Sequence, residues 1–224
     1  TFRGAALNSI LYTLACVLFA LILGMIFALL LDRAFLGRGL ARTLLITPFL
    51  IMPVASAMLW SVSMFNPSYG LVNWMIGLVG IDPVDWTSQM PRISVIVALV
   101  WQWTPFMMLL ILAGLQTLPR DCYEAARVDG VHPLRVFWKV TLPLLWPALM
   151  VAVIFRLLDA LRIFDLIYVL TSNNTSTISM SGFVRREMVD NGYMGYGSAA
   201  STALFFIIAL AVILYIRVGR VKLA

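Results

Sequence analysis

The sequence has 224 residues, of which 62% are hydrophobic and 12% charged, with a mean hydropathy of +0.97 and a formal net charge of +6. A water-soluble domain of this length could not bury so much apolar surface, so we expect lipid to be its main solvent. No basic stripe with interleaved aromatic residues is present, which argues against nucleic-acid binding. The single histidine, His132, and two distant cysteines argue against a Cys/His metal cluster.

Five stretches are long and apolar enough to cross about 30 Å of hydrocarbon as helices. We expect them at residues 5–31, 43–65, 93–115, 144–170 and 198–217, within one all-α integral membrane domain over residues 1–224. Proline at 48, 53 and 105 is expected to kink the second and third spans. A stripe of small residues, Ala20, Gly24 and Ala28, predicts close approach of another helix to the first span.

The charges of the loops predict how the spans are oriented across the membrane. The segments after the first and third spans and the C-terminal tail hold ten of the 16 basic residues, so the positive-inside rule makes them cytoplasmic. The loops at 66–92 and 171–197 are then external, and the first span begins outside, which leads us to expect an earlier span upstream. The ten residues are Arg33, Arg38, Arg42, Arg120, Arg127, Arg135, Lys139, Arg217, Arg220 and Lys222.

The expected cytoplasmic segment 116–143 is polar and separates two apolar stretches. Its residues predict two short helices joined by a turn. Asp121 can cap the first helix with Glu124 three residues later, Gly130 can end it with a positive φ, and Pro133 suits the first turn of the second. From spacing alone, this segment is either a docking element for a partner or a solvated linker between two spans.

The sequence from Glu124 to Gly130, Glu-Ala-Ala-Arg-Val-Asp-Gly, is followed after nine residues by Val-Thr-Leu-Pro at 140–143. This pattern resembles the EAA motif of permease subunits in binding-protein-dependent ABC importers, with Val140 in place of isoleucine. The resemblance implies a six-span permease, of which this chain holds five spans. It also implies that the segment docks on an ATP-hydrolysing subunit through Glu124, Ala125, Ala126, Asp129 and Gly130.

The chain has no phosphate-binding loop of the G-x4-G-K-[ST] type. We therefore expect it not to be an enzyme and to hold no cofactor of its own. ATP and magnesium would bind to the partner ATPase.

Four alternating charges, Arg156, Asp159, Arg162 and Asp165, interrupt the fourth span. Each would cost about 2.5–3.5 kcal/mol at a bilayer centre if nothing compensated it. One interpretation is a polar lining of the substrate path, and another is a structural ladder of ion pairs between neighbours three residues apart. A proton relay is a third.

The residues from Phe155 to Thr171 resemble the corresponding span of sugar permeases of the maltose-type group, which implies a sugar or polyol as substrate. That group often continues with a Gly-Gly-Gly-Pro-type loop, where this chain has Ser-Asn-Asn-Thr at 172–175. Sugars stack on aromatic rings, so aromatic residues of the third span, including Trp101, are further candidates. Packing or anchoring at the membrane interface is the commoner reason for such rings. The expected substrate-path residues are Trp103, Phe106, Asp159, Arg162 and Asp165.

Together these features predict the membrane-spanning subunit of an ATP-driven importer in the cytoplasmic membrane of a bacterium or archaeon. The resemblance implies two ATPase subunits, a second, related permease chain and an extracytoplasmic solute-binding protein as partners. The external loops would receive that binding protein. Trp74, Trp86, Tyr193 and Tyr196 could anchor it there, although an aromatic belt at the membrane interface explains these residues equally well. Two alternatives are an ion-coupled secondary transporter that uses Asp159 or Asp165, and a membrane scaffold that transports nothing.

Overall fold

The computed structural model describes residues 1–119, 121–172 and 174–219, and all regular elements in these ranges are helical. Arg120, Arg220 and Lys222, which contribute to the expected orientation, lie outside the described residues. The long helices are α1 (Phe2–Asp32), α2 (Arg38–Leu50), α6 (Pro91–Gln116), α9 (Leu142–Leu161) and α12 (Met194–Gly219). The shorter elements are α3 (Pro53–Met58), η1 (Leu59–Met64), α4 (Leu71–Gly77), α5 (Trp86–Gln89), α7 (Asp121–Val128), α8 (Pro133–Val136), η2 (Phe137–Thr141), α10 (Asp165–Leu170), α11 (Met180–Arg185) and η3 (Arg186–Asp190), where η marks a π-helical turn.

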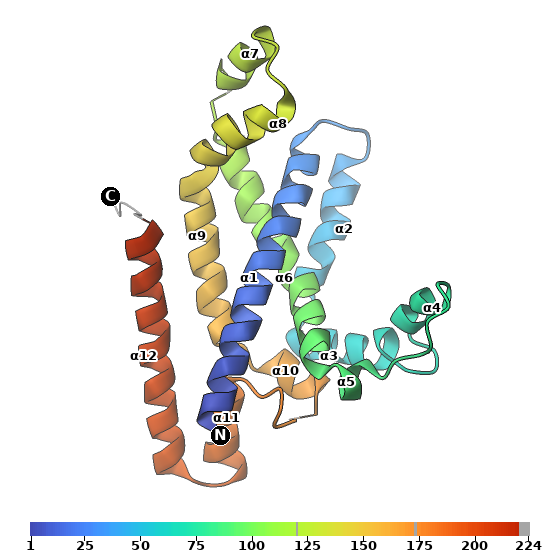
Figure 1. The fold of residues 1–224 in the computed structure, drawn as a ribbon, viewed down its shortest axis with the longest axis vertical. Coiled ribbons are helices and arrows are strands. Elements are labelled where there is room, and N and C mark those ends of the chain that lie inside the picture. The colour runs from blue at the N-terminus through green and yellow to red at the C-terminus, as the bar shows by residue number, and fades with distance from the viewer. Residues whose placement is uncertain (120, 173, 220–224) are drawn as a thin grey trace.

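Four helical stretches in the described ranges are long and apolar enough to cross a membrane: Phe2–Asp32, Pro91–Gln116, Pro133–Leu161 and Met194–Arg217. A fifth results if Arg38–Leu50 and Pro53–Met64, which meet at a bend of 95°, count as one span. The expected all-helical membrane fold is therefore confirmed. α7 and α8 lie at one end of the bundle, and α3 to α5, α10, α11 and the N-terminus lie at the other (Figure 1).

The second expected span, 43–65, is not one continuous helix. Ile51 and Met52 are extended, with ψ of 131° and 137°, and α3 begins at Pro53. Proline disfavours helical backbone at the residue before it and lacks the N–H that would continue the helix. Pro53 therefore lies at the point where the chain turns from α2 into the α3–η1 arm, while Pro48 stays inside α2 and Pro105 inside α6.

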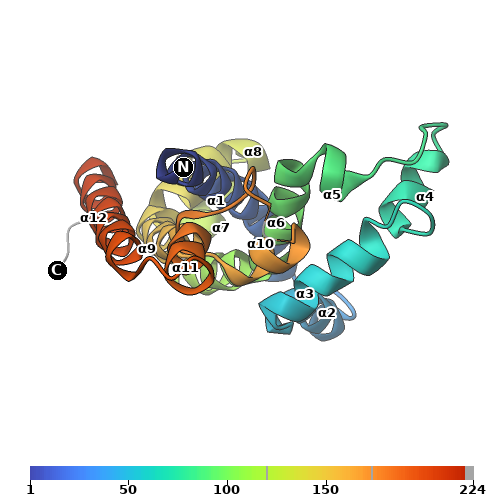
Figure 2. The same ribbon diagram turned by 90° about the horizontal axis from the view of Figure 1, so that it is seen from below.

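The fourth expected span, 144–170, also ends early. α9 stops at Leu161, and α10 begins at Asp165 after a break at Phe164, which has φ −137° and ψ −59°. Asp165 lies in the first turn of α10, where its negative charge interacts favourably with the positive end of the helix dipole. α10 packs against α3, so the break folds the chain back across the end of the bundle (Figure 2).

The centre of the bundle is formed by α1, α6 and α9, and α12 lies at its side along α9 (Figure 1). Ala20, Gly24 and Ala28 are buried on one face of α1. A Cβ atom placed on Gly24 would lie 3.0 Å from Met107 Cβ and 3.0 Å from the backbone nitrogen of Met108. The small-residue stripe therefore allows α1 and α6 to pack closely.

Candidate functional site

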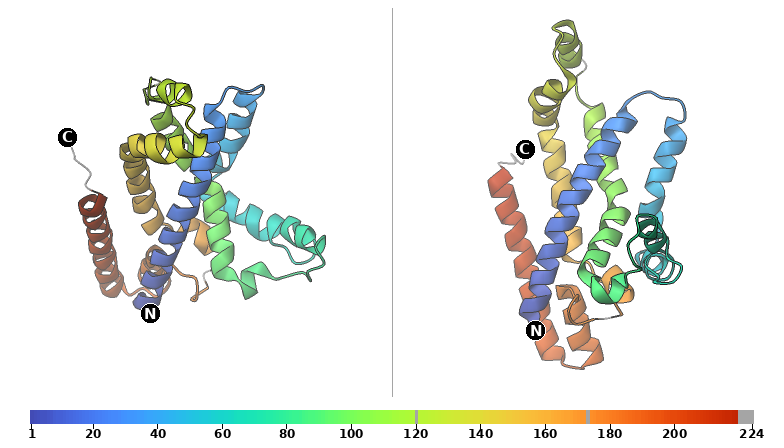
Figure 3. Two further views of the ribbon diagram at one scale, coloured as in Figure 1. Left: turned by 45° about the horizontal axis from the view of Figure 1, so that its top comes forward. Right: turned by 45° about the vertical axis from the view of Figure 1, so that its right-hand side comes forward.

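The segment with the EAA-type motif forms a compact helical knob at one end of the molecule. α7 carries Glu124, Ala125 and Ala126, and it extends beyond the ends of α1 and α6 (Figure 3). Both Asp121 and Glu124 lie in its first turn, so Asp121 does not precede the helix as a cap. Both negative charges interact favourably with the positive N-terminal end of the helix dipole. Glu124 and Ala125 are exposed, and Ala126 is half-buried.

Backbone geometry fixes the turn between α7 and α8. Gly130 has a φ of +65°, a region that a residue with a side chain rarely adopts. The backbone N–H groups of Asp129 and Val131 donate to the carbonyls of Ala125 and Ala126, both at 3.0 Å. α8 then begins at Pro133, with His132 Nδ1 accepting a hydrogen bond from Leu134 N at 3.3 Å. The turn is therefore held by short-range bonds on both sides, as the sequence predicted.

One long-range side-chain hydrogen bond connects the described part of this knob to the spans. Tyr123 Oη on α7 lies 3.1 Å from Thr141 Oγ1, and Thr141 is the last residue of η2. Thr141 is only 5% exposed, so the bond reaches from the knob into the packed end of α9. Both residues also line an open cavity of about 750 Å³, whose polar wall includes Glu124, Asp32 and Arg38.

The expected substrate-path residues separate into two groups. Trp103 and Phe106 on α6 pack together, with ring centroids 6.1 Å apart, and Phe49 of α2 contacts both at 5.7 and 5.5 Å. Asp159, Arg162 and Asp165 are exposed near the end of the bundle opposite α7. None of these three forms an ion pair with another described residue.

The interpretation of the four charges as a ladder of ion pairs does not agree with the structure. Among the described residues, salt bridges join Arg185 to Asp190 and Arg186 to Glu187, and neither involves the four charges of the fourth span. Because α9 ends at Leu161, the later members of the series no longer share one helix with Arg156.

Arg156 has an environment that the sequence did not predict. Its side chain is fully buried among α1, α6 and α9. Its guanidinium lies 4.5 Å from the Trp103 ring centroid, within range of a cation–π contact. Arg156 Nη2 donates to Cys16 Sγ at 2.9 Å, whereas Nε and Nη1 have no hydrogen-bond partner among the described residues. Arg156 and Trp103 therefore form one cationic and aromatic unit.

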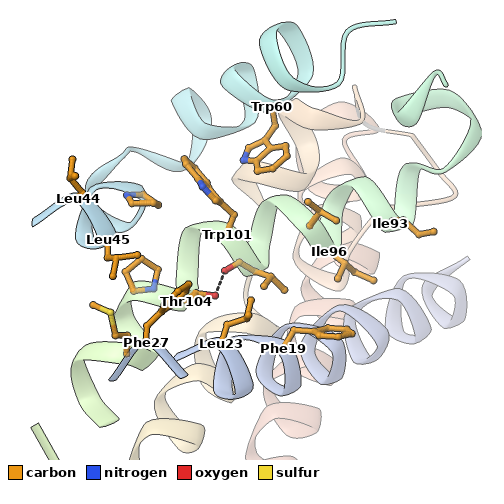
Figure 4. A pocket seen from close by; sticks show the side chains of 15 residues that line it. Phe19, Leu23, Phe27, Leu44, Leu45, Trp60, Ile93, Ile96, Trp101 and Thr104 are labelled. Atoms are coloured by element: carbon orange, nitrogen blue, oxygen red, sulfur yellow. Dashed lines mark hydrogen bonds between the residues drawn. The ribbon is translucent and has the colours of Figure 1, made fainter. Parts of the chain in front are cut away.

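A separate apolar groove of about 780 Å³ lies between α1, α2, η1 and α6 (Figure 4). Trp101 and Trp60 line it, whereas Trp103 does not. Its polar lining groups are the Thr104 hydroxyl and the indole N–H groups of Trp60 and Trp101. The Thr104 hydroxyl donates to Val100 O at 2.6 Å, and Trp60 Nε1 has no hydrogen-bond partner among the described residues. A lining with so few hydrogen-bonding groups suits hydrocarbon better than a polyhydroxylated solute.

The expected aromatic anchors of the loops opposite α7 differ in accessibility. Trp86 is half-buried, stacks on Phe65 at 5.8 Å and donates its Nε1–H to Asn73 Oδ1 at 3.0 Å, so it supports the loop from within. Trp74 and Tyr193 are exposed, by 62% and 64%. Tyr196 is also exposed but packs against Phe183.

Two known permeases of sugar transport systems are similar to this chain in sequence. The chain is 43% identical over 207 residues to the trehalose/maltose transport system permease protein MalF of Thermococcus litoralis, covering 90% of this chain and 69% of that protein. It is 40% identical over 200 residues to the trehalose transport system permease protein SugA of Mycobacterium tuberculosis, covering 88% of this chain and 63% of that protein. The chain thus spans about two thirds of these relatives.

Solved structures share the fold. A chain of a bacterial ABC transporter involved in the import of the acidic polysaccharide alginate superimposes with a TM-score of 0.87 at 23% identity, covering 99% of this chain and 80% of that chain. The family model described as binding-protein-dependent transport system inner membrane component matches residues 5–221. The chain therefore belongs to the family of inner membrane components of binding-protein-dependent transport systems.

Proposed function

We propose that this chain is the membrane-spanning permease subunit of an ATP-driven importer that moves a sugar or polyol inward by alternating access. The family supports the transport role, and the names of the two relatives described above, which are disaccharide permeases, support the substrate class. The exposed, internally braced knob of α7 and α8 is the observation that carries the proposal, because an energy-coupling element must meet a partner without deforming.

In this mechanism two ATPase subunits close on ATP, and each receives a knob from one permease chain. The motion passes through η2 into α9 and changes the side of the membrane to which the substrate cavity between the two permease chains opens. A solute-binding protein delivers the substrate at the opposite end, and a second permease chain completes the cavity. An importer with a related, different permease partner would need one copy of this chain.

Glu124→Lys tests the docking step. The substitution reverses an exposed charge that would face a basic groove on the ATPase, so association should weaken by about tenfold or more, and ATP-dependent uptake should fall with it. Co-purification of the ATPase with the permease and uptake into proteoliposomes measure the two effects. Asp121→Lys is the matched control because it makes the same charge change in the same exposed turn of α7, outside the docking set.

Normal association and normal uptake with Glu124→Lys would contradict the docking role. The ion-coupled alternative predicts a different result with the unmodified protein. Uptake should then stop when an uncoupler is added while ATP is retained, whereas an ATP-driven importer should continue. Asp159→Asn should abolish coupling in the alternative and change only substrate affinity or selectivity in the proposed mechanism.

A further inference from the structure

α4 presents an apolar stripe away from the rest of the molecule. Five side chains spaced as on one face of a helix are between 48% and 79% exposed, although all are apolar. α4 also extends sideways from the bundle and does not project past its end (Figures 1 and 2). The five residues of this stripe are Leu71, Trp74 and Met75 of α4 and Leu78 and Val79, which follow its last residue, Gly77.

The opposite face of α4 fixes the direction of this stripe. Asn73 is only 6% exposed, and its Nδ2 donates to the carbonyls of Asn66 and Val84 at 3.0 and 2.9 Å. Its Oδ1 accepts from Val84 N and Trp86 Nε1, at 3.1 and 3.0 Å. One buried amide thus uses four hydrogen bonds to close the loop on both sides of α4. The stripe cannot turn inward unless these bonds break.

The stripe lies in a long stretch of the chain that has no charged residues. No Asp, Glu, Lys or Arg occurs between Arg42 and Asp82, so the uncharged stretch continues from α2 through η1 and the whole of α4. The large exposed side chains along the preceding arm, Met52, Met58 and Val62, are apolar as well, and its exposed polar residues Ser63 and Ser68 are uncharged. The stripe therefore belongs to a long uncharged part of the surface.

Charge returns immediately after the stripe. Asp85 accepts hydrogen bonds from Thr87 Oγ1 at 3.0 Å and Ser88 N at 3.2 Å, and it caps α5. Hydrogen bonds from Ser88 and Thr87 hold the pKa of the Asp85 carboxyl below its ordinary value, so the group is ionised at neutral pH. The chain thus passes from a stretch without charged residues to one that contains them between α4 and α5.

We propose that the apolar stripe of α4 lies in the boundary between headgroups and acyl chains of the leaflet opposite the coupling knob. A helix that lies in the membrane plane buries an apolar face in this boundary, and a tryptophan ring such as that of Trp74 is favoured there. For Trp74, this assignment selects the position at the membrane interface over contact with a soluble binding protein. It does not depend on which solute the protein transports.

Site-directed spin labelling tests the proposal in the full assembly, reconstituted into phospholipid nanodiscs. Cys122→Ser removes the exposed native thiol, and Cys16 is fully buried. A nitroxide is then placed at Leu78 or Val79, with Gln89, an exposed residue of α5, as the matched control. Collisions with oxygen report lipid, and collisions with a water-soluble nickel chelate report solvent.

We expect the labels at Leu78 and Val79 to collide more with oxygen than with the chelate, and the label at Gln89 to show the reverse. Chelate access at Leu78 and Val79 equal to that at Gln89 would place the stripe in water and overturn the proposal. Immobile labels that neither reagent reaches would show that a protein subunit covers the stripe, which would overturn it too. Two positions are used so that the result does not depend on recovery of one variant.

Discussion

At the scale of single residues, Gly24 sets how closely α1 and α6 approach. A Cβ at this position would meet backbone as well as side-chain atoms of α6 at 3.0 Å, so Gly24→Ala must push the helices apart. We expect a destabilisation of about 1–3 kcal/mol, because overpacking outweighs the better helix propensity of alanine. The thermal unfolding midpoint of the purified assembly should fall.

Gly4 provides a control for Gly24 within the same helix. A Cβ on Gly4 would meet only Thr1 Oγ1, at an ordinary contact distance of 3.6 Å. Gly4→Ala should therefore leave the midpoint unchanged or raise it, since alanine stabilises a helix by up to about 1 kcal/mol relative to glycine. Equal midpoints for Gly24→Ala and Gly4→Ala would show that close packing of α1 on α6 is not required.

Trp103 and Trp101 lie two residues apart on α6 but have different neighbours. Trp103 contacts Arg156 and Phe106, whereas Trp101 packs on Trp60 in the apolar groove. If Trp103 forms part of the sugar path, Trp103→Leu should raise the KM for uptake several-fold, up to about tenfold, with a smaller change in maximal rate. Initial uptake rates over a range of sugar concentrations measure both.

Trp101→Leu is the control for Trp103→Leu, because it removes an indole ring of the same helix from the groove and leaves the Arg156 contact intact. Its KM should stay near that of the unmodified protein. A similar change of KM in both variants would indicate a general packing effect, and an unchanged KM in Trp103→Leu would remove this residue from the path.

At the scale of elements, the contact between α7 and η2 is expected to transmit motion. Tyr123→Phe removes the hydroxyl that bonds to Thr141 at 3.1 Å while keeping the ring. Loss of one such bond costs only about 0.5–1.5 kcal/mol, so folding and ATPase binding should persist. We expect fewer solute molecules transported per ATP hydrolysed, measured in proteoliposomes with the complete importer.

Substitutions of Thr141 test the same bond from its other partner. Thr141→Ser keeps a hydroxyl and should retain normal coupling, whereas Thr141→Val keeps the shape, removes the hydroxyl and should behave like Tyr123→Phe. An unchanged transport-to-hydrolysis ratio in both Tyr123→Phe and Thr141→Val would show that packing alone connects the knob to α9.

The helices were predictable where hydropathy and local residues decide the outcome. The apolar runs that form α1, α6 and α12 are long and uninterrupted, and Gly130 and Pro133 mark the ends of α7 and α8 by local backbone preferences. A kink near Pro53 was predicted, but the 95° bend that separates α2 from α3 was not, because the apolar composition continues through it. Proline signals a possible kink, but its angle depends on packing against α6 and α10.

At the scale of the whole molecule, the two candidate sites were not equally visible in the sequence. The knob of α7 and α8 is contiguous along the chain, so the residue pattern describes its backbone almost completely. The environment of Arg156 depends on Cys16, which is 140 residues away along the chain, and on Trp103 of a third helix. The charge of Arg156 within an apolar run was its local signal, and it did not reveal that the side chain is buried with no carboxylate partner in the described part of the chain.

The orientation of the assembled molecule can be tested with its own cysteines. Cys122 is exposed on α7, whereas Cys16 is buried, so a membrane-impermeant maleimide should react only at Cys122. If the knob meets a cytoplasmic ATPase, labelling should occur in inside-out vesicles, without the ATPase bound, and not in right-side-out vesicles. Gln89→Cys in a Cys122→Ser background should give the opposite pattern, because α5 lies at the other end of the bundle (Figure 1). Labelling of Cys122 in right-side-out vesicles would place the knob outside the cell, where no ATPase can reach it.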